Sequence, residues 1–192
     1  MRAKFDRVHD VYKEYVRIAE REDLKDKVVL KTDCHNESGI YNHSIPIVPV
    51  MKEAKKVYCL ELDEDVIRKA QKKTFDKLDN VFVNHGSISN LDDCYVNNTF
   101  DFIFDYSTID HIPFEDLKET LISYKDKLKV GGVINLVIWT SDKYEIENNN
   151  QMYFPKKEVD DMIKELFVID KDEWLLSAGC HKRLWYYRGV KE

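Results

Sequence analysis

Residues 57–73, VYCLELDEDVIRKAQKK, decide the fold class. The first six residues, Val57–Leu62, form a mostly apolar run that predicts a buried strand. Asp63 follows at the position of a helix N-cap, and apolar side chains then recur every three or four residues as far as Leu78. The chain therefore passes from a buried strand directly into an amphipathic helix, which is the repeating unit of a parallel α/β sheet.

The same alternation of strands and helices continues on both sides of this stretch. An amphipathic helix is expected within the first 20 residues, and helices are also expected at 47–55, 114–128 and 155–166. Further strands are expected at 27–33, 80–85, 100–106, 133–139, 167–170 and 183–190, and the polar stretch 142–151 is expected to be a loop. The pattern predicts an α/β fold with a doubly wound, mostly parallel sheet of seven strands and an antiparallel C-terminal edge strand.

Length and composition set limits on the kind of protein. The 192 residues suit a single domain over 1–192, in which an N-terminal helix, 1–22, flanks the core. A net charge of −6 argues against nucleic acid as a partner. The four cysteines have no zinc-binding spacing, so we expect reduced thiols and no metal site. The sequence has neither a signal peptide nor a membrane span, which favours a cytoplasmic protein; a homodimer is left open.

Glu61, at the end of the second strand, is the most informative single residue. Ligands of open parallel sheets bind beyond the carboxyl ends of the strands. A carboxylate at this point can accept hydrogen bonds from both hydroxyls of a ribose. The alternative interpretation is an ordinary strand-end carboxylate in solvent.

Four segments carry a resemblance to a known family. The segment 57–73 is similar to the second motif of class I S-adenosylmethionine-dependent methyltransferases, and 80–92 and 100–112 resemble the next two. Residues 128–139, LKVGGVINLVIW, look like the segment usually written L-K-P-G-G before strand 5, with Val130 in place of the proline. The resemblance covers about residues 27–139. It implies a Rossmann-like methyltransferase fold and S-adenosylmethionine as the cofactor.

The turn after the first strand departs from that family. The family has acid-x-G-x-G-x-G there, whereas residues 31–37 read KTDCHNE. Lys31 takes the place of the acid, and Asp33, His35 and Glu37 take the places of the glycines, so that Gly39 is left to supply the turn. Acids at this turn argue against a pyrophosphate and so against a nicotinamide cofactor, but they suit a sulfonium and an ammonium.

The resemblance implies a set of cofactor contacts. Asp33 is expected to bind the methionyl ammonium; in the alternative, Asp33 and Glu37 are exposed loop acids and the cofactor site is lost. Ser87 would accept a hydrogen bond from the adenine amino group, and Ile88 would pack on the ring. The full expected set is Asp33, Cys34, Glu37, Glu61, Leu62, Ser87, Ile88, Asp105 and Tyr106.

His111 is the best-placed candidate for a catalytic base, with Asp110 or Asp105 to orient it. The alternative is a histidine that only caps the following helix. His181 is a weaker candidate for the same cleft. Lys182 and Arg183 would meet an anionic acceptor, or else are ordinary surface charges.

These expectations lead to a main function and two alternatives. The main one is methyl transfer from S-adenosylmethionine to a small-molecule or sugar-like acceptor. The second is a catalytically inactive relative that serves as a binding or assembly subunit. The third, a nucleic-acid methyltransferase, is disfavoured because the segment after the fourth strand reads DYST, without the N/D-P-P-Y/F/W motif of base methylation.

Overall fold

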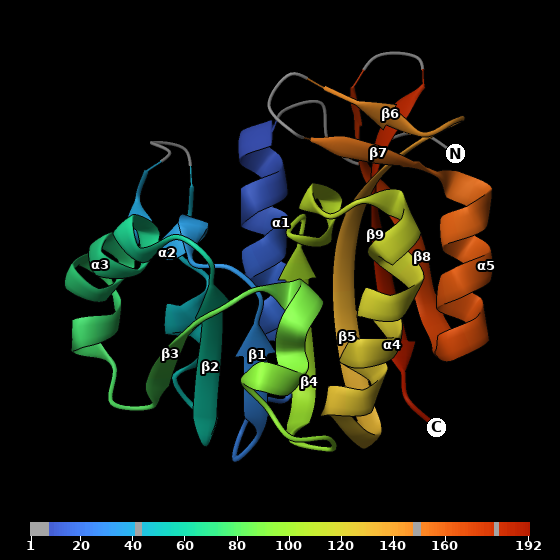
Figure 1. Ribbon diagram of the computed structural model, residues 1–192. Coiled ribbons are helices and arrows are strands. Elements are labelled where there is room, and N and C mark those ends of the chain that lie inside the picture. The colour runs from blue at the N-terminus through green and yellow to red at the C-terminus, as the bar shows by residue number, and fades with distance from the viewer. Residues whose placement is uncertain (1–7, 41–43, 148–150, 179–180) are drawn as a thin grey trace.

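A computed structural model describes residues 8–40, 44–147, 151–178 and 181–192. These residues build one mixed sheet with helices on both faces (Figure 1). The strands are β1 (Val28–Lys31), β2 (Lys56–Glu61), β3 (Val81–His85), β4 (Phe100–Tyr106), β5 (Leu128–Ser141), β6 (Glu145–Ile146), β7 (Met152–Pro155), β8 (Val168–Ala178) and β9 (Lys182–Val190). The α-helices are α1 (Val8–Arg21), α2 (His35–Ser38), α3 (Glu64–Lys73), α4 (Leu117–Lys127) and α5 (Lys156–Leu166).

The strands follow the order β3-β2-β1-β4-β5, and all four pairings in this run are parallel. β9 then pairs antiparallel with β5 on one side and with β8 on the other. The doubly wound, mostly parallel sheet and its antiparallel C-terminal pair are confirmed.

The two faces of the sheet carry separate hydrophobic cores, because successive side chains of a strand point to opposite faces. Val29 of β1 faces the cluster that includes Val11 and Ile18 of α1. Leu30, the next residue, faces the cluster that includes Leu121 of α4 and Ile163 of α5. The sheet is thereby closed on both sides, and its ligand-binding edge lies at the strand ends.

Asp63 caps α3 as expected, since its Oδ1 accepts hydrogen bonds from the backbone N–H groups of Asp65 at 2.7 Å and Val66 at 3.4 Å. The helix expected at 47–55 is instead a 3₁₀ turn, Val48–Met51, with Pro49 in its first turn. The helix expected at 114–128 starts with a 3₁₀ turn, Phe114–Asp116, before α4 begins. Neither the 3₁₀ turn nor α4 has a side-chain N-cap, and short 3₁₀ turns are common at the ends of α-helices.

The loop expected at 142–151 was wrong in part, because the chain forms β6 there and then β7. β5 continues for 14 residues, beyond the last β4 pairing of Tyr106 with Val137. Its free end is paired by β7, where Thr140 lies opposite Phe154. The sheet consequently has nine strands where seven were expected. β8 is also longer than expected, because the polar residues 170–173 interrupt the apolar pattern before the buried Leu175 and Leu176.

Two expectations reach beyond the described residues: the apolar position Phe5 and the thiol of Cys180. No helix in the described ranges combines the length and apolar character that crossing a bilayer requires.

Candidate functional site

A cavity of about 580 Å³ opens at the carboxyl ends of β1, β2 and β4. This is the edge at which open parallel sheets bind their ligands, and the volume lies within the range of small-molecule sites. Its lining residues are Val11, Tyr12, Tyr15, Thr32, Asp33, His35, Asn36, Glu61, Leu62, Asp63, Gly86, Ser87, Ile88, Tyr106, Ser107, Thr108, His111, Ile112, Trp139, Gln151, Leu176 and Leu184.

The turn after β1 is built around a buried lysine, Lys31. Lys31 is 0% exposed, and its Nζ donates a hydrogen bond to the Asp33 carbonyl oxygen at 2.7 Å. The same ammonium lies 3.1 Å from Asp33 Oδ2 and 3.2 Å from Glu37 Oε2. Although burial disfavours the charged amine, the two facing carboxylates raise the pKa of Lys31 above its ordinary value. Lys31, Asp33 and Glu37 therefore form an ion triad, called the β1 triad below.

Glu37 acts within the fold, because its side chain is fully buried and does not line the cavity. Its Oε1 accepts hydrogen bonds from the backbone N–H groups of Ile47 at 2.9 Å and Val48 at 3.1 Å. Gly39 ends α2 in the left-handed region with φ +68°, which confirms that it supplies the turn. Because Glu37 pairs with Lys31 and lies outside the cavity lining, we infer that it positions the turn and does not contact a ligand.

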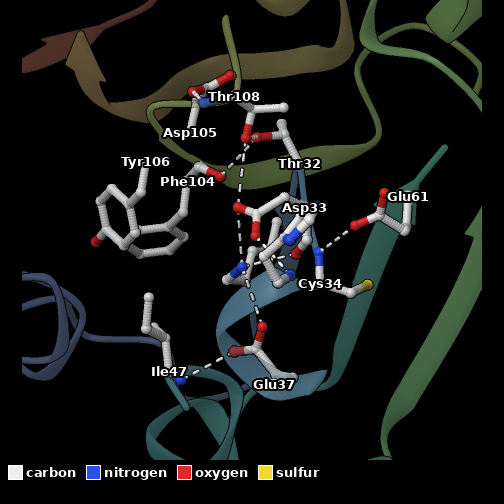
Figure 2. Close-up of polar contacts among 12 residues, drawn as sticks. Thr32, Asp33, Cys34, Glu37, Ile47, Glu61, Phe104, Asp105, Tyr106 and Thr108 are labelled. Atoms are coloured by element: carbon white, nitrogen blue, oxygen red, sulfur yellow. Dashed lines mark hydrogen bonds and ion pairs between the residues drawn. The ribbon is translucent and has the colours of Figure 1, made fainter. Parts of the chain in front are cut away.

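Asp33 lines the cavity and joins the β1 turn to the loop after β4. Its Oδ1 accepts a hydrogen bond from the His35 N–H at 2.9 Å, and its Oδ2 accepts one from Thr108 Oγ1 at 3.3 Å. Figure 2 shows the Asp33 carboxyl turned toward Thr108. Burial opposes ionisation of Asp33, but the neighbouring Lys31 ammonium outweighs it and holds the pKa below its ordinary value. An ionised carboxylate therefore faces this part of the cavity.

Glu61 ends β2 and is only 6% exposed, yet it lines the cavity. Its Oε2 accepts the Cys34 N–H at 2.9 Å. Its Oε1 accepts the N–H groups of Leu62 at 2.9 Å and Asp63 at 3.0 Å. Because a carboxylate offers about four acceptor positions, one remains, on Oε2. This geometry provides for one ribose hydroxyl, where the sequence suggested two.

Apolar and small residues form the cavity wall beyond Glu61. Leu62 is 67% exposed and Ile88 is buried, and both line the cavity. Ser87 caps the following 3₁₀ turn by accepting a hydrogen bond from the Ser89 N–H at 3.2 Å. At Gly86, an added Cβ would lie 2.9 Å from Cys94 Sγ, so a larger residue does not fit without movement.

Two buried acids, Asp105 near the end of β4 and Asp110 in the loop after it, do not line the cavity. Asp105 accepts hydrogen bonds from the Thr108 N–H at 3.0 Å, the Ile109 N–H at 3.2 Å and the Tyr124 hydroxyl at 2.5 Å. Burial raises the pKa of Asp105 to about 6 despite these hydrogen bonds. Burial also raises the pKa of Asp110 well above its ordinary value.

Asp110 and His111 do not form the expected pair. Asp110 Oδ1 accepts the Trp139 N–H at 2.8 Å, and no hydrogen bond joins Asp110 to His111 within the described residues. His111 has an exposed side chain that lines the cavity. The backbone explains the separation, because His111 ends a 3₁₀ turn, Ile109–His111, in which neighbouring side chains point in different directions.

The structure divides the expected site residues into two groups. Those that line the cavity are Asp33, Glu61, Leu62, Ser87, Ile88, Tyr106 and His111. Those that lie behind its wall are Cys34, Glu37, Asp105 and Asp110. Cys34 contributes its backbone N–H to Glu61, and its thiol is buried beside Cys59.

The weaker candidates from the C-terminal hairpin do not line the cavity. His181 Nδ1 lies 2.9 Å from Asp142 Oδ2 on the exposed surface. Lys182 pairs with Glu147, and the guanidinium of Arg183 stacks 4.6 Å from the Trp174 ring centroid. The expectation that these two cations meet an anionic acceptor is therefore corrected.

Sequence reasoning missed the second half of the cavity wall. It comes from Tyr12 and Tyr15 of α1, Gln151, Leu176 of β8 and Leu184 of β9. Helical spacing identified the two tyrosines as part of an apolar face, but the spacing does not tell which face of the sheet they cover. Within the described ranges, no three His, Cys, Asp or Glu side chains gather as a metal site would require.

Comparison with known proteins bears on the family and the fold. Residues 43–136 match a family described as methyltransferase domain, a stretch that starts after the β1 triad and α2. No curated protein matches the sequence.

Solved structures share the fold at low identity. A Burkholderia thailandensis 1,6-didemethyltoxoflavin-N1-methyltransferase, solved with S-adenosylhomocysteine, is 14% identical, with TM-score 0.71 over 96% of this chain and 79% of that one. The N-methyltransferase NodS from Bradyrhizobium japonicum is 10% identical, with TM-score 0.70 over 95% and 86%. The [4+2]-cyclase SpnF is 11% identical, with TM-score 0.79 over 100% and 84%.

The sheet order and the cavity at its strand ends place the chain in the Rossmann-like fold class that these methyltransferase structures share. The match to a methyltransferase domain covers residues 43–136, just under half of the chain.

Proposed function

We propose that this chain transfers the methyl group of S-adenosylmethionine to a small-molecule acceptor, and that Glu61 and Asp33 are its main donor-binding residues. One observation carries the proposal. Glu61 and Asp33 face the same cavity from neighbouring strand ends, and Glu61 keeps one acceptor position open.

The charges of the cavity suit this donor, which carries a sulfonium and an ammonium. Asp33 is held ionised by Lys31, so its carboxylate attracts the methionyl ammonium at the β1 turn. The β1 triad has one cation and two carboxylates, so its formal charge stays negative. A substituted turn without glycines therefore remains compatible with a cationic ligand.

The remaining donor contacts follow from position along the strand ends. The Oε2 atom of Glu61 accepts one ribose hydroxyl, and the adenine ring lies between Leu62 and Ile88. Ser87 offers its hydroxyl to the adenine amino group. Tyr106, at the end of β4, flanks the methionyl part.

Catalysis requires the acceptor to be aligned with the methyl group, and alignment alone is worth roughly 7–11 kcal/mol. When bound, the donor supplies a methyl carbon that an acceptor lone pair can attack while sulfur leaves as a thioether. His111 takes the proton of the acceptor, since its imidazole lines the cavity. Asp110 acts as a positioning residue, because it holds the backbone of Trp139.

Calorimetric titration with S-adenosylhomocysteine tests the donor site. Glu61→Gln keeps the volume of the side chain but loses charge and acceptor capacity, so we expect at least about tenfold weaker binding. Glu158→Gln, an exposed change on α5, is the matched control and should bind like the wild type. Absence of binding to the wild type at millimolar ligand would favour the non-catalytic interpretation. Equal binding by Glu61→Gln would remove the role of Glu61.

A further inference from the structure

We propose that the acceptor half of the cavity selects a small arylalkyl amine, whose ammonium group is joined to an aromatic ring through an alkyl chain, and rejects acceptors that carry a carboxylate or a phosphate. This inference rests on the proposed function, which it extends to the chemical class of the acceptor.

The first support is the charge of the cavity wall. Its described lining includes the acids Asp33, Glu61 and Asp63 but neither lysine nor arginine. Lys31 is near the cavity but fully buried, and its ammonium is already paired with two carboxylates. An anionic acceptor would thus lose its hydration without gaining a cationic partner, which is costly.

The nearest cations of the C-terminal hairpin are engaged elsewhere. Lys182 pairs with Glu147 and lies 3.5 Å from Glu145, and Arg183 stacks on Trp174. Neither lines the cavity. Bound S-adenosylmethionine would bring one net positive charge, and the three lining acids exceed it in number. The site therefore stays favourable for an amine when the donor is present.

The second support is the aromatic wall opposite the strand ends. Tyr12 and Tyr15 meet edge to face, with ring centroids 5.6 Å apart and an interplanar angle of 77°. Tyr15 stacks on Tyr106 at 4.6 Å, and Trp139 completes the wall. Aromatic faces attract both flat rings and ammonium groups. Leu184 and other apolar side chains also line the cavity.

Ser107 fixes the start of the loop that lines the acceptor half of the cavity. It lines the cavity directly after β4 in a left-handed conformation, with φ +65°, and its N–H donates to the Val137 carbonyl oxygen at 2.9 Å. A non-glycine residue held in this region is strained, and such strain gathers at ligand sites. The Ser107 hydroxyl oxygen is buried beside Tyr15 and Asp110, so Ser107 fixes this part of the cavity wall.

The transfer balances with the residues present. The ammonium form of the acceptor gives one proton to the His111 imidazole, which leaves a nitrogen lone pair. The N–C bond then forms as the methyl C–S bond breaks, and the bonding pair stays on sulfur. The product is a methylated ammonium together with the thioether of the donor.

Two probes of matched size test the inference by calorimetry: 2-phenylethylamine, a cation, and phenylacetate, an anion. Each is titrated into the full chain, both alone and saturated with S-adenosylhomocysteine. We expect the amine to bind at least about tenfold more tightly in both states. Equal affinity, or tighter binding of phenylacetate, would overturn the inference.

A variant reverses the sign of the cavity charge. His111→Arg places a fixed cation at an exposed lining position, and we expect it to shift the preference toward phenylacetate. His111→Gln is the uncharged control and should keep the preference for the amine. If His111→Arg fails to fold, the two probes on the wild type still decide the matter.

The outcomes separate the two proposals. Binding of S-adenosylhomocysteine without a preference for the amine contradicts this inference alone. A preference for the amine in a protein that does not bind S-adenosylhomocysteine supports the acceptor site and contradicts the proposed donor site.

Discussion

The ends of β1 and β4 both carry acids at the same edge of the sheet, but the pKa values of those acids are shifted in opposite directions. After β1, the Lys31 ammonium holds Asp33 in its ionised form. After β4, burial raises the pKa of both Asp105 and Asp110. A buried cation accounts for the difference. Negative charge is thereby kept at Asp33, which lines the cavity, and reduced at Asp105 and Asp110, which lie behind its wall.

Loss of the buried cation is expected to have the largest effect. Lys31→Met leaves two buried carboxylates without a partner, and we expect about 3–5 kcal/mol lower free energy of unfolding. Urea denaturation at pH 7 measures this. The double variant Lys31→Met with Glu37→Gln should recover part of the loss, because the second change removes one of the two uncompensated charges. A loss below about 1 kcal/mol would contradict a structural role for the β1 triad.

The two strand ends should also differ in the pH dependence of stability. The pKa of Asp105 is raised from 3.8 to about 6, so the folded protein binds more protons than the unfolded chain between these values. Its stabilising contribution is present below pH 3.8 and is lost as pH rises through about 6. The difference corresponds to about 3 kcal/mol. For Asp33 the pKa is lowered, so the sign is opposite and stability is lost as pH falls through its folded pKa.

Urea denaturation at several pH values tests this contrast. Between pH 4 and pH 7, the wild type should lose more stability than Asp105→Asn does. Asp33→Asn should instead flatten the loss that the wild type shows at lower pH. If both variants changed the profile in the same direction, the contrast between the two strand ends would be wrong.

Catalysis should depend on His111 more than on its neighbour Asp110. His111→Gln should lower kcat by roughly 10²-fold, as expected for loss of a general base, and leave S-adenosylhomocysteine affinity unchanged. Asp110→Asn keeps an acceptor oxygen for the Trp139 N–H and should retain most of the activity. Methylation assays across pH compare the two variants. A larger loss in Asp110→Asn would restore Asp110 as the reacting group.

The smallest expected effect concerns backbone strain at Ser107. Both Ser107→Gly and Ser107→Ala remove the hydroxyl, but only glycine relieves the left-handed conformation. Glycine should therefore give the more stable variant by about 1 kcal/mol, measured by thermal unfolding. Equal stability of the two variants would mean that this position is not strained.

The part of the fold that could be predicted depends on local signals. The β2–α3 unit follows from a run of apolar residues and an N-cap at Asp63, which lie next to each other in the chain. β6 and β7 were missed because they depend on how far β5 extends past β4, a long-range property. The polar residues 170–173 hid the second half of β8 in the same way, since its pairing with β9 outweighs local propensity.

The candidate site shows the same division. Glu61 and Ile88 follow strands in sequence, and their place at the cavity could be predicted. The pairing of Lys31 with Glu37 could not, because it depends on the path of the turn between them. The acceptor wall from Leu176 and Leu184 is set by how the C-terminal hairpin packs, which no motif in the sequence reports.

A crystal structure of the protein grown with S-adenosylhomocysteine tests the central claim most directly. We predict a ribose hydroxyl within hydrogen-bonding distance of Glu61 Oε2, the adenine between Leu62 and Ile88, and the amino group at Asp33. A ligand bound elsewhere, or a cavity closed by the side chains of the β1 turn at saturating ligand, would contradict the account.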